Sequence, residues 1–268
     1  MLRRDFLAIL AGSPLVFGLR ELLAQEAAPD YFTNALKRMK ETRRFGVVLV
    51  IPSDKDAQKR LGEGLLARLA TGSKAGSVGF EIFCANVLIC LSETKARDIS
   101  DGKPAGEGVL RILLNPEGKK VAADRVKLAT LENFGLFRES FTKFINGEDG
   151  ARLRDHALAI EKVMPEDLKQ AVARLVGEPE EARAAMDVLK SKADTIAPWL
   201  VQKMSEKSGA PFRAVLWGYY LEQAGKDPEP CLPFGVKVER VAVDDPCPPC
   251  GMAAYRGSAY RFLSFYEK

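Results

Sequence analysis

Three cysteines near the end of the printed sequence carry its most specific chemical signal. Cys247 and Cys250 form a Cys-x-x-Cys pair, and Cys231 precedes a predicted strand at residues 236–243. A disulfide from Cys231 to either partner would close a loop of about 15 to 20 residues and stabilise the fold by about 3 kcal/mol. This use is favoured in an oxidising compartment, and it requires no cofactor.

Two other uses of the same segment stay open. A strand, a Cys-x-x-Cys pair and a helix, here predicted for residues 255–265, would lower the pKa of Cys247 and suit a thiol–disulfide oxidoreductase acting through Cys247 and Cys250. Residues 247–252 (CPPCGM) also resemble the Cys-x-x-Cys-Gly-Met motif of copper-accessory lipoproteins. That resemblance implies copper as the cofactor, held by Cys247, Cys250 and Met252, since soft sulfur donors suit Cu(I). The motif is similar to half a zinc knuckle as well, but tetrahedral zinc needs a second ligand pair.

The other residues that could take part in catalysis or metal binding are predicted to have structural roles. His156 is the single histidine of the chain, which argues against a histidine-based triad or a multi-histidine metal site. It lies beside the apolar stripe of a predicted helix, so we expect a residue at the boundary of a core. Cys84 and Cys90, if they share one strand, are about 20 Å apart, too far for a disulfide. We expect both to be small buried apolar residues.

The first residues predict export. Arg3 and Arg4, followed by Phe6 and Leu7, resemble a twin-arginine export signal. The apolar run at residues 6–19 is shorter than the about 20 residues that a spanning helix needs. We therefore expect a signal peptide at residues 1–28 and a chain in the periplasm or cell envelope that is either soluble or held only by its uncleaved signal. No later segment is apolar enough to predict a membrane span.

Residues 29–147 show the alternating helices and strands of an α/β domain. Continuous apolar runs predict strands buried on both faces of a sheet, and a Pro-Glu-Gly turn at residues 115–118 predicts a hairpin after the last of them. The strands are expected at residues 45–51, 87–91, 109–114 and 119–122, with helices at 31–44, along Leu61, Leu65 and Leu69, and along Phe134, Phe137, Phe141 and Phe144.

This order of elements resembles the thioredoxin fold, with the best local match at residues 108–118. The resemblance implies a three-layer thioredoxin-like domain, but a degenerate one. Leu110 stands where the family has a cis-proline, and residues 52–57 (PSDKDA) stand where it has Cys-x-x-Cys. Because thiol–disulfide exchange needs a thiolate, the usual chemistry of the family cannot occur at that position.

Residues 148–226 show only helical periodicity. Five short helices are predicted, the third beginning at Pro179, the fourth containing Ile196 and Leu200, and the fifth beginning at Pro211. Residues 175–185 and 197–200 resemble a HEAT-type repeat. A solenoid needs about three repeats, so we expect a small helical bundle packed on the first domain. The cysteine-containing tail, residues 227–268, follows it.

The charge pattern narrows the classes of function. The net charge is +4, and basic residues are interspersed with acidic ones, which argues against a nucleic-acid partner. The sequence therefore favours an exported, non-enzymatic thioredoxin-like binding or scaffold protein with a protein partner. A thiol oxidoreductase and a copper-binding accessory protein are the alternatives.

Overall fold

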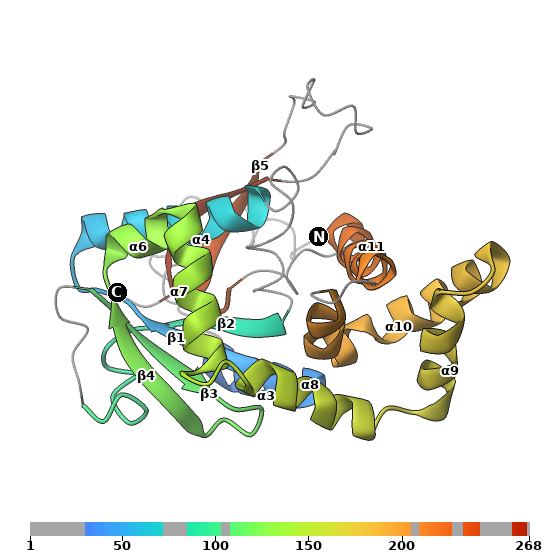
Figure 1. The fold of residues 1–268 in the computed structure, drawn as a ribbon. Helices are drawn as coiled ribbons and strands as arrows, with labels where there is room; N and C mark the ends of the chain where they lie inside the picture. Colours follow the sequence, from blue (N-terminus) through green and yellow to red (C-terminus); the bar gives the residue numbers. More distant parts are fainter. Residues whose placement is uncertain are drawn as a thin grey trace, which may run out of the picture.

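A computed structural model describes residues 30–71, 85–102, 108–204, 209–226, 233–241 and 259–266. An α/β region comes first, a run of helices follows it, and two further strands complete the described chain (Figure 1). The elements are α3 (Tyr31–Thr42), β1 (Phe45–Val50), α4 (Lys55–Thr71), β2 (Asn86–Leu91), β3 (Val109–Leu114), β4 (Lys120–Val126), α6 (Leu128–Glu132), α7 (Phe134–Asn146), α8 (Arg152–Lys162), α9 (Glu166–Leu175), α10 (Pro179–Met204), α11 (Ala210–Lys226), β5 (Val236–Val241) and β6 (Ala259–Phe265).

The first region forms a four-stranded mixed sheet in the order β2-β1-β3-β4. Strands β1 and β2 are parallel, whereas β1 pairs with β3, and β3 with β4, in antiparallel fashion. Every residue of β1, β2 and β3 is buried, as their apolar sequences predict. Strand β4, at the edge of the sheet opposite β2, is partly exposed. The predicted α/β class and the predicted order of elements are confirmed.

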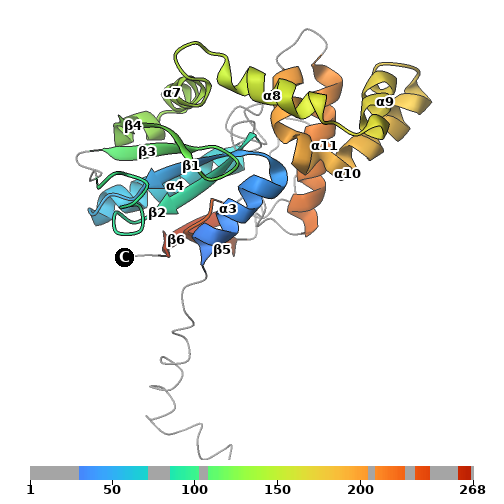
Figure 2. The ribbon, with the colours of Figure 1, turned by 90° about the horizontal axis from the view of Figure 1, so that it is seen from below.

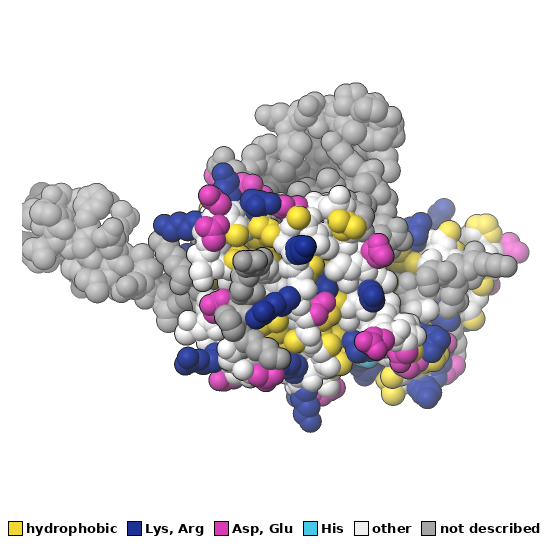
Figure 3. Space-filling view, turned by 60° about the vertical axis from the view of Figure 1, so that its left-hand side comes forward, with side chains coloured by type: hydrophobic (Ala, Val, Ile, Leu, Met, Phe, Trp, Pro, Cys, Tyr) yellow, Lys and Arg dark blue, Asp and Glu magenta, His cyan; other side chains and the backbone are white. Residues whose placement is uncertain are grey.

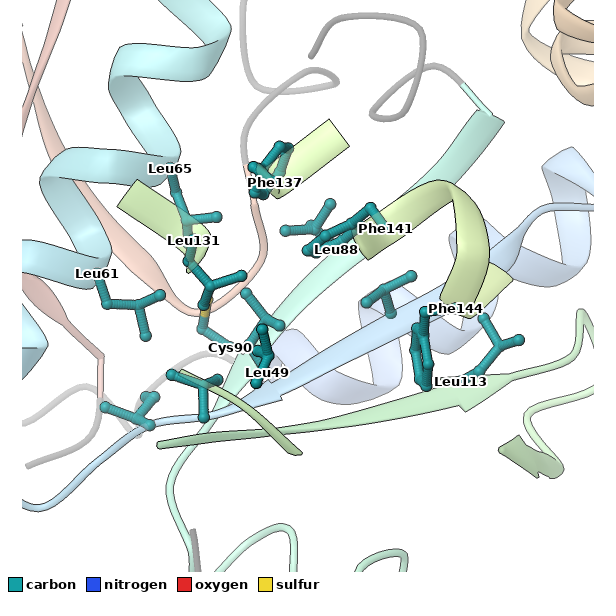
Figure 4. Packing of buried hydrophobic residues seen from close by; sticks show 14 of the residues in the cluster. Leu49, Leu61, Leu65, Leu88, Cys90, Leu113, Leu131, Phe137, Phe141 and Phe144 are labelled. Carbon is teal, nitrogen blue, oxygen red and sulfur yellow. The ribbon is translucent and has the colours of Figure 1, made fainter. Parts of the chain in front are cut away.

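Helices cover both faces of this sheet. Alternate residues of β1 divide between two cores, so that Val47 and Leu49 face α4, α6 and α7, while Val48 and Val50 face α3. This alternation follows from the period of two residues along a strand. Figure 4 shows the first core, where phenylalanines of α7 meet leucines of α4 and of the sheet.

The last described strands form a hairpin, which corrects the helix predicted for residues 255–265. Strand β6 pairs with β5 in antiparallel fashion, and the register shifts between Lys237 and Val238. Phe262 and Phe265 both pack on the core beside α4, although two residues three apart on a regular strand point to opposite faces. The bulge reconciles their helix-like spacing with a strand, since it inserts an extra residue into the pairing.

The same hairpin is anchored to the sheet through its edge strand β2. The backbone N–H of Phe234 donates to the Leu88 carbonyl, and the N–H of Cys90 donates to the Phe234 carbonyl, each at 2.9 Å. The Tyr266 ring stacks on Tyr31 at the start of α3, with ring centroids 5.6 Å apart, and Figure 2 shows β5 and β6 beside α3. We call the described residues of 30–146 and 233–266 the sheet unit. Residues 152–226, the helical unit, are inserted within it.

The helical unit has a core of its own, built from α8 to α11 around Trp199, Leu189 and Leu200. Helix α8 belongs to both units, because Leu153 in its first turn packs on the sheet core while Ala157 and Ile160 lie in the helical core. Among the described residues, no helix is both long and apolar enough to cross a membrane.

Helix α10 runs through Pro198 without a break, which corrects the prediction of separate third and fourth helices. Proline has no N–H, so the helix cannot bond to the carbonyl four residues earlier, that of Asp194. Arg44, which directly precedes β1, supplies the missing donor: its Nη2 donates to the Asp194 carbonyl at 3.1 Å and to Asp194 Oδ1 at 2.6 Å. A proline inside this helix is therefore accommodated by a side chain from the sheet unit.

Candidate functional site

The turn that joins β1 to α4 is the position where the sequence predicted a thioredoxin-like site without sulfur. Asp54 caps the helix, because its Oδ1 accepts a hydrogen bond of 2.7 Å from the N–H of Ala57. Gln58 Nε2 donates to the Pro52 carbonyl at 2.9 Å and ties the turn to the first turn of α4. Ser53, Asp54 and Lys55 are exposed. The turn is therefore an ordered, polar surface at the end of a buried parallel strand.

The nearby face of the molecule carries charges of both signs. Arg60 on α4 and Glu132 on α6 form two hydrogen bonds of 2.6 Å each. Hydrogen bonding to Arg60 lowers the pKa of Glu132 and the same bond raises the pKa of Arg60. The pair fixes α4 against α6 at the surface. On the face shown in Figure 3, basic side chains are interspersed with acidic ones, without a stripe of one sign.

Cys90 is the cysteine that the described part of the chain contains. It lies on β2, is fully buried, and burial raises the pKa of its thiol. Figure 4 shows its sulfur among leucine side chains such as Leu49 and Leu131. A thiol with a raised pKa and no exposed surface provides no thiolate for exchange, so Cys90 acts as a small apolar residue, as predicted.

The other candidate groups lie outside the described residues. These are Cys84, the cysteines and methionine of the tail, and the residues of the export signal (Cys231, Cys247, Cys250, Met252, Arg3, Arg4, Phe6 and Leu7). The structure does place both ends of the segment that carries Cys247, Cys250 and Met252. Val241 and Ala259, the described residues on either side of that segment, are paired partners of β5 and β6.

Among the described residues, no group of three or more His, Cys, Asp or Glu side chains is arranged to hold a metal ion. The predicted copper ligands are not part of that search, since all three lie in the segment between β5 and β6.

His156 lies where the two units meet, in keeping with the predicted boundary position. Its Nε2 is hydrogen-bonded to the Arg43 carbonyl, and its ring centroid is 4.8 Å from that of Phe45. Burial lowers the pKa of His156, the hydrogen bond to the Arg43 carbonyl opposes that shift, and the charge of Arg43 adds to it. The half-buried ring thus joins α8 to the turn between α3 and β1.

Two buried arginines were missed at the level of sequence. Arg111, within β3, is 3% exposed; its Nε donates to Asp124 Oδ1 at 2.8 Å and its Nη1 to Ser140 Oγ at 2.8 Å. Arg44 is 2% exposed and binds Asp194, which also pairs with Arg38 at 2.9 Å. A single charge next to or inside an apolar run gives no sign of its partner, because Asp194 is 150 residues from Arg44 in the chain.

The fold and this turn together define a mixed α/β protein with a helical insertion and a sulfur-free, capped turn after its first strand. In comparisons with protein-family models, with curated proteins and with solved structures, the chain has no match. Its function has to be inferred from these residues.

Proposed function

We propose that the chain is an exported, non-catalytic binding protein with a degenerate thioredoxin-like sheet unit. The strand order β2-β1-β3-β4 supports this, with β1 and β2 parallel and the β3–β4 hairpin antiparallel. So does the position of α4, which directly follows β1, and of α7, which follows β4. The sequence resemblance to the thioredoxin fold at residues 108–118 falls on β3 and the turn that follows it.

The observation that carries the non-catalytic role is the cap of α4. At the start of a helix after a central strand, a cysteine would be activated by the helix N-terminus. Asp54 occupies this position instead, with its carboxylate bound to the Ala57 N–H. The exposed side chains of Ser53, Asp54 and Lys55 form the docking face for a protein partner in this proposal.

Export is the second part of the proposal. It is supported by Arg3, Arg4, Phe6 and Leu7, which resemble the twin-arginine signal. In this proposal the chain functions in the periplasm or cell envelope. Replacing Arg3 and Arg4 by lysine keeps the charge but removes the paired guanidinium groups, and cell fractionation then tests whether the chain remains in the cytoplasm.

An insulin-reduction assay tests the absence of catalysis. The purified full chain is expected to reduce insulin no faster than the reductant alone, and Cys247→Ser is expected to behave in the same way. Turnover that Cys247→Ser abolishes would overturn the proposal in favour of an oxidoreductase acting through Cys247 and Cys250. Copper that co-purifies with the chain but not with Cys247→Ser would favour copper binding instead.

Site-specific photo-crosslinking tests the docking face. A photoreactive residue in place of Lys55, on the first turn of α4, is expected to give a discrete adduct in cells that export the chain. The matched control replaces Lys169, an exposed lysine of α9, and is expected to give none. Equal labelling from both positions, or none from Lys55, would remove the turn as the docking face.

A further inference from the structure

The contact between Arg44 and Asp194 joins the two units and also supplies a hydrogen-bond donor that α10 lacks. Helix α10 has lost one backbone hydrogen bond, because Pro198 cannot donate to the Asp194 carbonyl. Arg44 Nη2 donates to that carbonyl and also to the Asp194 carboxylate. One guanidinium nitrogen therefore replaces the missing backbone donor and pairs with the charge of the same residue.

The contact between Arg44 and Asp194 is buried and includes a second arginine. Arg44 is 2% exposed, so its guanidinium is shielded from water where it meets Asp194. Arg38 Nη2 pairs with the second carboxylate oxygen of Asp194 at 2.9 Å. Both arginines come from α3 and the turn that follows it, so the sheet unit supplies two cations to the Asp194 carboxylate.

Prolines are a principal cause of sharp bends in helices. In α10 a donor from outside the helix replaces the bond that Pro198 lacks. The two units otherwise keep separate cores: the apolar residues of the helical core lie between Ala157 and Tyr219, and those of the sheet cores lie outside that range. Release of Arg44 would leave the Asp194 carbonyl without its donor at the position where α10 is weakest.

We propose that α10 is a latched hinge: Arg44 holds the helix straight across Pro198, and loss of this contact lets α10 bend there. The part of the helix before Pro198 then moves relative to the part after it. The arrangement couples the geometry of the helical unit to the position of one side chain of the sheet unit.

A double-mutant design tests this proposal by hydrogen–deuterium exchange of the full chain. Arg44→Met keeps an unbranched buried side chain but removes the donor, and is expected to speed exchange of the amides of residues 195–202 on the order of tenfold, as for loss of one charge-assisted hydrogen bond. Pro198→Ala restores the helix's own donor. Exchange in the Arg44→Met, Pro198→Ala chain should therefore stay close to the rate of the Pro198→Ala chain.

Because Pro198→Ala favours the helix by itself, the Pro198→Ala single variant is the reference. A latch predicts that Arg44→Met speeds exchange in the wild-type background and has little effect in the Pro198→Ala background, whereas a merely structural ion pair predicts the same effect in both. An equal effect of Arg44→Met in the two backgrounds would overturn the proposal. If Arg44→Met does not fold, Arg44→Lys with and without Pro198→Ala decides the question by the same comparison. Asp187→Asn, which removes the exposed partner of Lys190 on the same helix, is the control and should leave exchange at residues 195–202 unchanged.

Discussion

At the scale of single residues, helix ends and strand ends determine what the candidate site can do. Asp54 stabilises the first turn of α4 by accepting the Ala57 N–H, a contact that contributes about 1 kcal/mol in typical helices. A carboxylate at this position attracts hydrogen-bond donors, whereas a thiolate there would attack disulfides. In the proposed function, the side chains at positions 54 and 57 are therefore the first to separate a binding surface from a redox site.

This difference can be tested by introducing Asp54→Cys together with Ala57→Cys. The side chain at position 54 already reaches the backbone at position 57, so the two thiols are expected to form a disulfide and to give measurable insulin reduction. The control, Asp54→Ser with Ala57→Cys, has one thiol in the turn and should not turn over. Peptide mass spectrometry identifies the bond; free thiols at both positions under oxidising conditions would show that the turn lacks thioredoxin-like geometry.

His156 makes the stability of the chain depend on pH. Burial lowers its pKa below the ordinary value of 6.5, so the folded chain binds a proton less readily than the unfolded chain. Between the folded pKa and 6.5 the unfolded state carries more protons, and stability falls as the pH falls through that window. Urea denaturation across this range should show that His156→Gln flattens the dependence; an unchanged slope would exclude His156 as its cause.

At the scale of elements, α4 and the hairpin that packs on it illustrate what the sequence could predict. The buried strands and the order of elements follow from apolar runs that directly reflect burial. The hairpin of β5 and β6 could not be predicted in this way. Phe262 and Phe265 have the spacing of a helix, and only the bulge in the pairing of β5 and β6 explains how both lie on one face. The sulfur-free turn of the candidate site was predictable from residues 52–57, whereas the partner of Arg44 depends on a contact between segments 150 residues apart.

Two glycines of α4 should respond to alanine in opposite directions. A Cβ on Gly62 would lie 2.3 Å from the Phe262 ring, whereas a Cβ on Gly64 would have no atom within 4 Å. Gly64→Ala is expected to stabilise the chain by about 0.5–1 kcal/mol through helix propensity. Gly62→Ala is expected to destabilise it by about 1–3 kcal/mol through overpacking. Urea denaturation of both variants measures the two signs, and stabilisation by Gly62→Ala would show that the hairpin is not packed on α4.

At the scale of the whole molecule, the two units have separate cores, joined through α8 and the contacts around Asp194. Domains with independent cores and a polar contact between them need not unfold together. Both tryptophans of the chain, Trp199 and Trp217, belong to the helical unit, so tryptophan fluorescence reports on this unit alone.

We therefore expect fluorescence and circular dichroism to give different urea midpoints. Fluorescence follows the helical unit, while circular dichroism at 222 nm sums over both units. Coincident transitions by the two probes would show that the units unfold as one. In that case, repeating the measurement with Asp194→Asn identifies whether the contact with Arg44 is what couples them.

The insertion of the helical unit within the sheet unit also fixes an order of assembly. During synthesis the ribosome completes α8 to α11 before it makes β5 and β6, yet Phe265 of β6 lies in the core beneath α4. The helical unit can thus fold before the sheet unit is complete, because β5 and β6 of the sheet unit are synthesised last. The sheet unit is completed only when β6 packs on α4. This contact spans the whole helical unit in sequence, and contacts so distant in sequence form slowly.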